Sequence, residues 1–487
     1  MDTHSDKPAP APAAPVARFV EGSTLRHVAV MTAAGSVGLV AVFVVDLLNL
    51  FYISLLGETE LAAAIGYAGT AMFFTTSVAI GVMIAGSALV SRAIGAGRRE
   101  EARRLSTSAF LYMTVATVLL VALLMPFVTP MLSLLGATGQ TREVAALFLN
   151  IVLPSTPLLG IGMAASGTLR AVGDARRSMW VTLSAGLVTA VLDPLLILVL
   201  GLGVEGAAIV TVFARVVMAA YGLYAVVRVH DLAARPSVSG FVKDVRPLSG
   251  IAIPAILTNI ATPAGNAYIT HALAPHGDAA VAAWAVIGRL IPVAFGPLFA
   301  LTGAIGPVIG QNVGARRFDR VRQSILDSLK LTLGFVLTMW LALALARGPI
   351  AGVFSLSPEG VALVEFFCLY AAGSFVFMGA LFVANAAFNN LGAPLLSTLF
   401  NWSRATLGVV PFVWLGGRWY GAEGVIAGQA LGSVAFGVAA LISAFAVVAR
   451  LQRRAVTSAS TPAPAPALVV GELPPFSKGE DASALGS

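Results

Sequence analysis

Two aspartates stand inside long apolar stretches of this sequence. Asp46 lies within AVFVVDLLNLFYI, and Asp193 lies within VLDPLLILVL. A charged carboxylate at the centre of a bilayer costs roughly 2.5–3.5 kcal/mol on insertion scales, so we expect both to face a protein interior rather than lipid. Each has a small polar neighbour on its own helical face, because Asn49 follows Asp46 by three residues and Thr189 precedes Asp193 by four.

These side chains predict an oxygen-rich pocket. Pro194 has no N–H, so the carbonyl of Ala190 loses its usual helical partner. Together with the threonine hydroxyls, the pocket suits a hard cation such as Na⁺, with Asp46, Asp193 and Thr211 as ligands. It equally suits a proton, because burial and a neighbouring like charge both favour the protonated carboxyl. The alternative is that these polar residues only brace helix packing.

The composition indicates the elements that must position these residues. The 487 residues are 58% hydrophobic and only 11% charged, whereas soluble domains carry roughly 25% charged residues. The apolar residues fall in twelve blocks long enough to cross a bilayer core of about 30 Å. The fold class predicted is an all-α polytopic membrane protein with twelve transmembrane helices.

Internal similarity divides the chain into two halves. IGAGRREEARR matches VGARRFDRVR, and VEGAA echoes AEGVI, each at an offset of about 218–220 residues. Six spans per half predict two six-helix bundles that are parallel repeats, related by a pseudo-two-fold axis along the membrane normal. The predicted parts are a disordered segment (1–24), a first bundle (25–228), a connector (229–246), a second bundle (247–449) and a disordered tail (450–487).

Basic residues cluster on one side of the predicted spans. The loop SRAIGAGRREEARR carries five arginines, and the other loops on that side are also rich in Arg. The positive-inside rule then predicts a chain in the cytoplasmic membrane with both termini cytoplasmic. The net charge of +7 therefore does not indicate a nucleic-acid partner. No GxxxxGK[ST] motif is present, which argues against ATP-driven export by this chain alone.

Several segments resemble the multidrug and toxic compound extrusion (MATE) family. They are DLLNLFYISLLGETELAAA, LRAVGDARRS and LDPLLILVLGLGVEGAAIVT, which occur in the family's order. The resemblance implies the DinF-like branch, in which an Asp in span 1 and another in span 5 form the coupling site, matched here by Asp46 and Asp193. Thr211 matches the branch, while Thr189 replaces its usual Asn. Span 1 also lacks the family's frequent proline.

The resemblance implies a secondary active exporter that works by alternating access. It would exchange H⁺ or Na⁺ for amphipathic, often cationic, drug-like organic compounds, and would act as a monomer in membrane lipid without a cofactor. Neutral polar residues of the second half, Asn259, Asn266 and Asn385, are candidates for the substrate cleft.

Two other functions stay open from the sequence. A lipid-linked oligosaccharide flippase of the same superfamily would gather cations in its cleft, and the candidates for that are Arg289, Arg404 and Arg215. An integral membrane enzyme would need clustered His, Ser or carboxylate groups at one membrane face.

Overall fold

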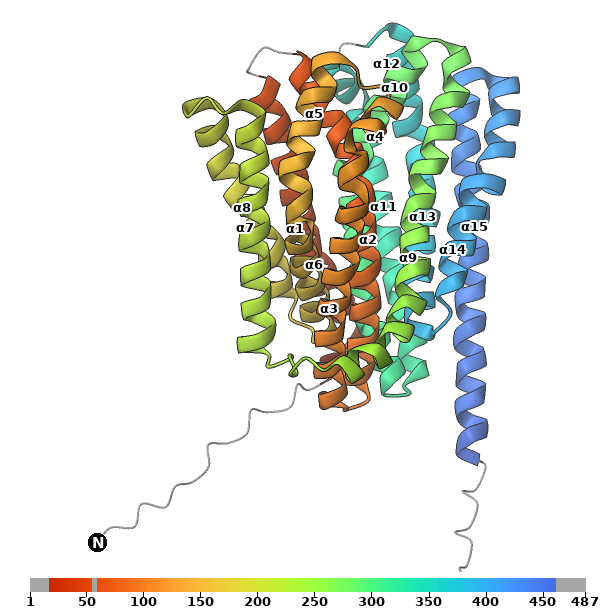
Figure 1. Cartoon of the computed structure of the whole chain (residues 1–487). Helices are drawn as coiled ribbons and strands as arrows, with labels where there is room; N and C mark the ends of the chain where they lie inside the picture. The colour runs from red at the N-terminus through yellow and green to blue at the C-terminus, as the bar shows by residue number, and fades with distance from the viewer. Residues whose placement is uncertain (1–16, 55–58, 355, 461–487) are drawn as a thin grey trace, which may run out of the picture.

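The computed structural model describes residues 17–54, 59–354 and 356–460 of the chain. For residues 45–54, 59–62 and 458–460 it describes the backbone but not the side chains. The described chain is built from long helices that run roughly side by side, and this part of it contains no strand (Figure 1).

The first half follows a short 3₁₀ helix, η1 (Arg18–Val20). Its helices are α1 (Thr24–Ser54), α2 (Thr59–Gly95), α3 (Arg99–Leu124), η2 (Met125–Phe127), α4 (Val128–Leu134), α5 (Gly139–Val152), η3 (Leu153–Ser155), α6 (Thr156–Ala171), α7 (Ala175–Asp193), the π-helix η4 (Pro194–Val199), α8 (Gly203–Tyr224) and the π-helix η5 (Ala225–Val229).

The second half repeats this order. Its helices are α9 (Val238–Leu273), η6 (Ala274–His276), α10 (Asp278–Gly314), α11 (Phe318–Val353), α12 (Pro358–Phe366), the π-helix η7 (Phe367–Ala371), η8 (Ala372–Ser374), α13 (Phe375–Leu391), α14 (Pro394–Ser403), the π-helix η9 (Arg404–Gly408) and α15 (Val410–Ser460).

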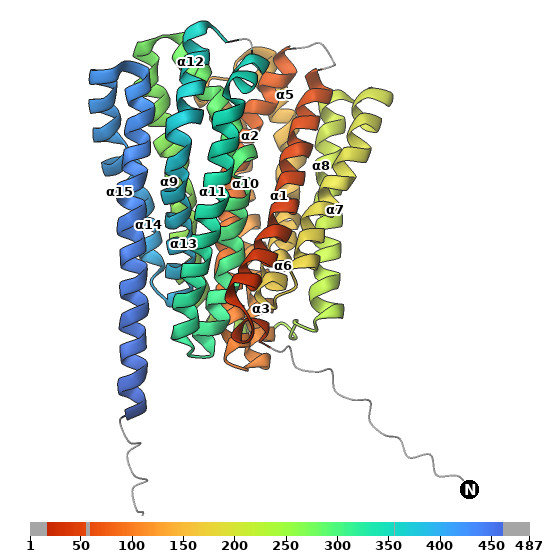
Figure 2. The same ribbon diagram turned by 180° about the vertical axis from the view of Figure 1, so that it is seen from behind.

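The predicted count of twelve spans is confirmed. Among the described residues, 11 helical segments are long and apolar enough to cross a membrane, and the last, Pro394–Thr457, is 64 residues long. This segment turns back on itself at Tyr420 and Gly421, whose backbone angles are not helical. Gly416 then lies against Gly424, and further down Gly408 lies against Gly432, so two antiparallel helices cross here (Figure 2).

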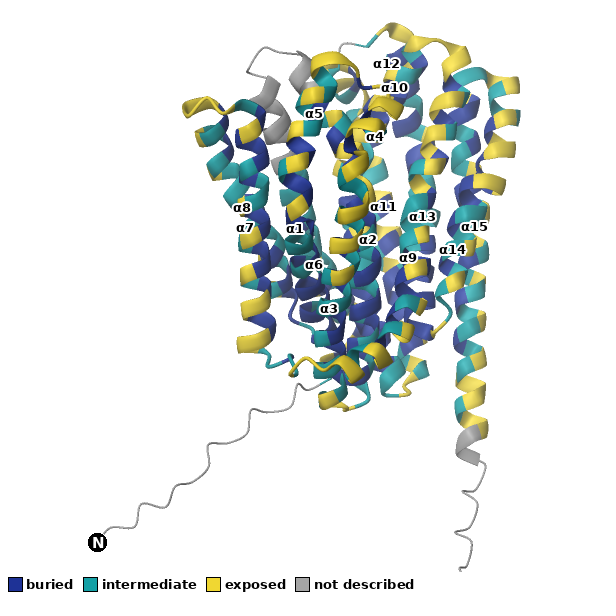
Figure 3. Ribbon diagram, viewed as in Figure 1, coloured by how far each residue is buried: buried dark blue, intermediate teal, exposed yellow. Residues whose placement is uncertain are grey.

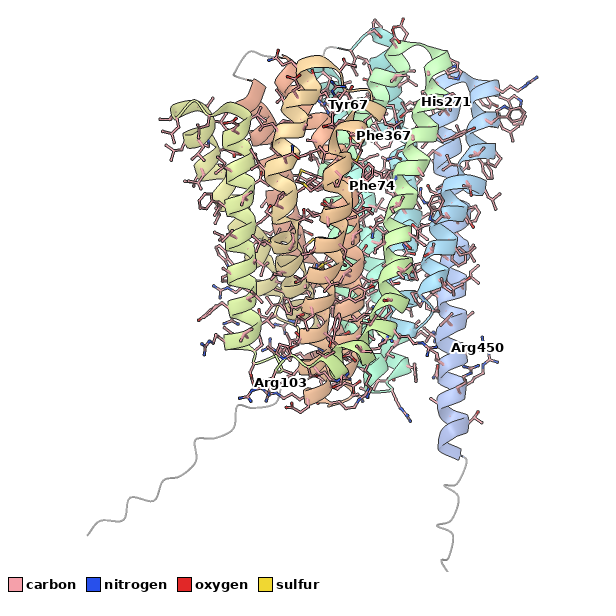
Figure 4. The ribbon with its side chains drawn as sticks, viewed as in Figure 1. Tyr67, Phe74, Arg103, His271, Phe367 and Arg450 are labelled. Carbon is pink, nitrogen blue, oxygen red and sulfur yellow. The ribbon has the colours of Figure 1, made fainter. Side chains whose placement is uncertain are left out.

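One end of the bundle carries the Arg-rich loops, and we call it the basic end. Arg103 and Arg450 lie there, while Tyr67 and His271 lie toward the opposite end (Figure 4). The residues between the halves, from His230 onward, are docked there. Asp231 forms ion pairs with Arg99 at 3.0 Å and with Arg103 at 3.2 Å.

The halves are in direct contact at the basic end. A Cβ atom on Gly95 of α2 would overlap the backbone oxygen of Gln311 on α10, and one on Gly314 would overlap the backbone oxygen of Arg92. Arg92 and Gln311 are 219 residues apart, as are Gly95 and Gly314. The contact therefore obeys the predicted pseudo-two-fold relation.

Two hydrogen bonds between the halves obey the same relation. The Arg92 guanidinium donates to the carbonyl oxygen of Asn389 at 2.6 Å, and the Gln311 side chain donates to that of Ala171 at 2.7 Å. Each bond joins α2 or α10 to the last residues of the fourth span of the other half, so the basic end is closed.

The structure differs from the expected disorder of residues 1–24, because the chain is ordered from residue 17. Phe19 is only 3% exposed, and its N–H donates to the Gln311 side chain at 2.9 Å. Its carbonyl accepts from Asn312 at 3.1 Å and from Arg320 at 2.9 Å. These contacts satisfy the backbone of a segment whose Ala- and Pro-rich composition gives no sign of order. The last helix also continues past 450, to Ser460.

Candidate functional site

Asp193 is buried at a break in a membrane-spanning helix. It ends α7, is 1% exposed, and is followed by the π-helix η4, which begins at Pro194. A π-turn arises where the usual ladder of hydrogen bonds is interrupted, and such turns are frequent at functional sites. Because Pro194 has no N–H, the carbonyl of Ala190 cannot accept its usual bond and can serve as a further oxygen at this level.

The two threonines on neighbouring turns keep acceptor oxygens. The Thr189 hydroxyl donates to the Ala185 carbonyl at 3.1 Å, and the Thr211 hydroxyl donates to the Ala207 carbonyl at 2.9 Å. A hydroxyl that has donated its proton still has lone pairs for a cation or a protonated carboxyl. No cluster of three or more His, Cys, Asp or Glu occurs in the described part of the chain. A Na⁺ ion at Asp193 would therefore draw on hydroxyl and carbonyl oxygens.

The side chains of Asp46 and Asn49 lie outside the described residues, although their backbone belongs to α1. Helix α1 lies along α7 and also contacts η4 and α8. A Cβ atom on Gly38 would lie 3.6 Å from Thr182 of α7. Because α1 and α7 are both odd-numbered spans and run in the same direction, residues 46–49 of α1 reach the level of residues 190–193 of α7.

A polar and aromatic stripe lies on α2, in the half of the helix away from the basic end. It consists of residues spaced three or four apart that are exposed, although α2 is central in the sequence of the half: Ala63, Gly66, Thr70, Phe73 and Phe74. From Thr75 to Ile94 every residue of α2 is buried or half-buried (Figure 3). Phe74 is labelled in Figure 4, between the level of Tyr67 and the basic end.

Helix α10 has the same stripe at an offset of 219 residues. Its exposed members are Ala282, Ala285, Gly288, Arg289 and Val293, and from Ala300 to Gly314 every residue is buried or half-buried. We call these two sets the α2 stripe and the α10 stripe.

Both stripes lie on the helix face that meets the other half further down. Continuing the α10 stripe by helical steps leads to Gly296, beside Phe43 of α1, then to Ala300, whose Cβ lies 3.4 Å from where Gly35 would carry its own, and then to Gly314. Continuing the α2 stripe leads to Gly81, beside α9, and to Gly95. The faces that touch at the basic end therefore diverge toward the opposite end, where the stripes are exposed.

The candidate cleft residues separate into two groups. Asn266 is exposed and Asn259 is half-buried, and both share the face of α9 on which Ala252 and Ile256 meet Gly81. Asn385 differs from the expectation.

It is 5% exposed, and its side-chain oxygen accepts from Asn401 at 2.9 Å. Its carbonyl also accepts from the Ser397 hydroxyl at 3.3 Å. Asn385 thus joins α13 to α14 inside the second half, because a buried amide needs partners that only neighbouring helices supply.

The three candidate cations of the flippase alternative do not gather. Arg215 is 6% exposed and donates to the Val152 carbonyl and the Ser155 hydroxyl, both at 2.9 Å. Arg404 is 4% exposed and bonds Thr262 at 3.4 Å. Only Arg289 is exposed. A pyrophosphate site formed by all three is not assembled.

The sequence singled out Arg289 without giving it a place, and it did not single out Phe73 or Phe74. Aligning the halves at the 219-residue offset would have found them, since it sets Arg289 opposite Thr70 on a helix whose exposed face is readable from its small residues.

A second carboxylate is tied down at the basic end, outside the spans. Asp174 accepts from His230 at 2.8 Å, and from both the backbone N–H and the guanidinium of Arg177 at 3.0 and 2.7 Å. Burial alone would raise the pKa of Asp174, but these bonds outweigh it and hold that pKa well below its usual value. Asp174 is therefore an ionised structural anchor between the first half and the connector.

Comparison with known proteins agrees with this architecture. The pattern of the family described as MatE matches residues 36–195 and 254–415, two stretches whose starts are about 218 residues apart. The chain is 30% identical to the FAD transporter of Shewanella oneidensis over 415 residues, covering 84% of this chain and 92% of the relative. It is 23% identical to the multidrug export protein MepA of Staphylococcus haemolyticus, covering 91% and 97%.

A solved structure has the same fold. The crystal structure of a mutant of the MATE transporter VcmN from Vibrio cholerae is 25% identical, superimposes with a TM-score of 0.82, and covers 88% of this chain and 97% of its own. With two matched repeats, a relative that is 30% identical over most of both chains, and the same helical architecture, the expected family is confirmed. The chain belongs to the MATE family and is a membrane transporter rather than an enzyme.

Proposed function

We propose that this transporter is a secondary exporter that couples the entry of H⁺ or Na⁺ to the release of amphipathic organic compounds. The observation that carries the proposal is Asp193, a carboxylate buried at a π-turn in a membrane-spanning helix. Ionisable groups inside membrane spans are costly, and they mark ion and proton pathways.

Asp46 is the proposed partner of Asp193. The register of α1 on α7, fixed by the approach of Gly38 to Thr182, supports this pairing because it puts the two positions at similar depth. A proton or a Na⁺ ion would neutralise the pair. If the two carboxyls interact strongly, they titrate as one unit. Asn49, Thr189 and Thr211 would supply the remaining oxygens.

The closed basic end supports an outward-facing state. By the positive-inside rule this end, with both termini, faces the cytoplasm. The stripes on α2 and α10 would then line the route by which substrate leaves. One charge that moves inward across 100 mV supplies about 2.3 kcal/mol for the return to the inward-facing state.

The relatives suggest the kind of cargo. One is named a multidrug export protein and another an FAD transporter, so small organic compounds are the proposed substrates, carried by a monomer in lipid.

The test is transport in proteoliposomes with pH and Na⁺ gradients imposed separately. We expect one gradient to drive accumulation of a fluorescent substrate by the wild type, and Asp193→Asn and Asp46→Asn each to reduce that accumulation at least tenfold. Glu205→Gln removes an exposed carboxylate from the first turn of α8 and should leave transport unchanged.

Full gradient-driven transport by both Asp variants would refute the coupling role. Equal losses in the Glu205 variant would mean that the assay reports protein damage rather than coupling.

A further inference from the structure

Arg289 is a cation without a structural role in the described part of the chain. It lies in the membrane-spanning helix α10, about 16 Å along the axis from Asp278. No hydrogen bond, ion pair or ring contact to it is found among the described residues. Arg215 and Arg404, by contrast, are buried and bonded. A guanidinium at this depth is costly unless water or an anion meets it.

Its face excludes the simplest alternative, that it points into lipid. Val293, Gly296 and Ala300 follow Arg289 on the same face. The last two pack on α1 of the other half, near Phe43 and Gly35. Arg289 therefore faces the first half across the space into which the two helices diverge.

The opposite wall is aromatic. By the pseudo-two-fold relation, Thr70 of α2 lies at the level of Arg289, and Phe73 and Phe74 lie one turn nearer the basic end. Phe73 is 43% exposed and Phe74 is 46% exposed, with their rings edge to face at 6.3 Å. A cation on one wall and aromatic rings about 6 Å lower on the other fit a compound that carries an anionic group on a flat ring system.

We infer that Arg289 and the Phe73–Phe74 pair form a binding site for anionic aromatic compounds of the nucleotide or flavin-phosphate class. The Arg fork binds phosphate oxygens through two parallel hydrogen bonds, and the phenylalanines offer a surface on which a ring stacks. This inference rests on the proposed export function and specifies its cargo, replacing the cationic compounds expected from the sequence.

Equilibrium binding to the purified protein tests the site without any ion gradient. The probes are FAD, riboflavin, which has the same ring system without phosphates, and ethidium as a cation. We expect Arg289→Ala to weaken FAD binding at least tenfold while changing riboflavin binding less than twofold, and Arg289→Lys to recover part of the loss. Phe74→Ala should weaken FAD and riboflavin to the same extent.

The matched control is Arg347→Ala, which removes an exposed Arg of α11 that bonds only its own helix, at the Ala344 carbonyl. It should bind FAD as the wild type does. Unchanged FAD binding by Arg289→Ala, equal losses for FAD and ethidium, or wild-type protein that binds ethidium but not FAD would each overturn the inference. Because binding needs no gradient, these outcomes are separate from a failure of coupling, which only the Asp193 and Asp46 variants report.

Discussion

At the scale of single residues, the chain uses its buried charges in two ways. Asp174 and Arg215 are bonded to fixed protein groups, and their work is to hold elements together. Asp193 and Arg289 lie in spans at positions where a mobile ligand can meet them, one at a helix break and one on an exposed stripe. Burial and bonding, rather than charge itself, separate the structural group from the functional one.

The Asp174 anchor predicts a pH-dependent stability. Its pKa in the folded protein is lowered below the unfolded value of about 3.9. The stabilisation is therefore fully present above about pH 4 and is lost as the pH falls through the folded pKa. We expect Asp174→Asn to lower the free energy of unfolding by about 2 kcal/mol at pH 7. The difference from the wild type should shrink below pH 4, as measured by thermal unfolding in detergent.

Asp231→Asn is the control for this prediction. Asp231 pairs with Arg99 and Arg103 but is 42% exposed in its side chain, so its loss should cost less than about 1 kcal/mol. Equal destabilisation by both variants, at every pH, would contradict the role given to Asp174.

At the scale of elements, glycine decides how closely the halves approach. Because a Cβ atom at Gly95 would overlap the Gln311 backbone, Gly95→Ala must push α2 and α10 apart at the basic end. We expect this variant to spend more time open at that end.

The measurement is maleimide labelling of Ser91→Cys, a position that is fully buried against Gly310, after the native Cys368 has been replaced by Ala. Labelling should rise at least fivefold in Gly95→Ala. In Gly69→Ala, on the same helix but with nothing within 4 Å of a new Cβ, it should stay at the background level. A closed basic end in Gly95→Ala would show that the contact can yield without opening.

The elements were largely predictable, and their irregularities were not. Apolar blocks twenty or more residues long gave the twelve spans, because every backbone group in lipid must be bonded within a helix. The proline at 194 indicated a weakened helix, but not that the chain would close it as the π-turn η4. The burial of Asn385 also escaped prediction, because an Asn in an apolar run reads the same whether it faces a neighbouring helix or an open route.

At the scale of the whole molecule, the ordered start of the chain joins the two halves. The backbone of Phe19 is bound by Gln311, Asn312 and Arg320 of the second half, and its ring approaches Gly173 of the first. Composition could not predict this, because the segment is ordered by contacts with residues about 290 positions away rather than by local propensity.

Removing residues 1–20 should therefore weaken the closed basic end. We expect labelling of Ser91→Cys to rise at least threefold in the truncated protein, because Gln311, Asn312 and Arg320 lose the segment that they hold. A truncation of residues 1–12, which leaves Phe19 and its partners intact, should label as the full chain does. Identical labelling in both truncations would mean that the glycine contact alone keeps this end closed.

The seating of Phe19 also bears on how this protein should be handled. The two ends of the chain are not interchangeable for attaching a fusion partner or an affinity tag. A bulky group placed close to residue 17 would compete with the contacts that join the halves and would bias the population being purified. The far end of α15 extends well beyond the rest of the bundle (Figure 1), so a carboxy-terminal attachment leaves the alternating cycle free to run.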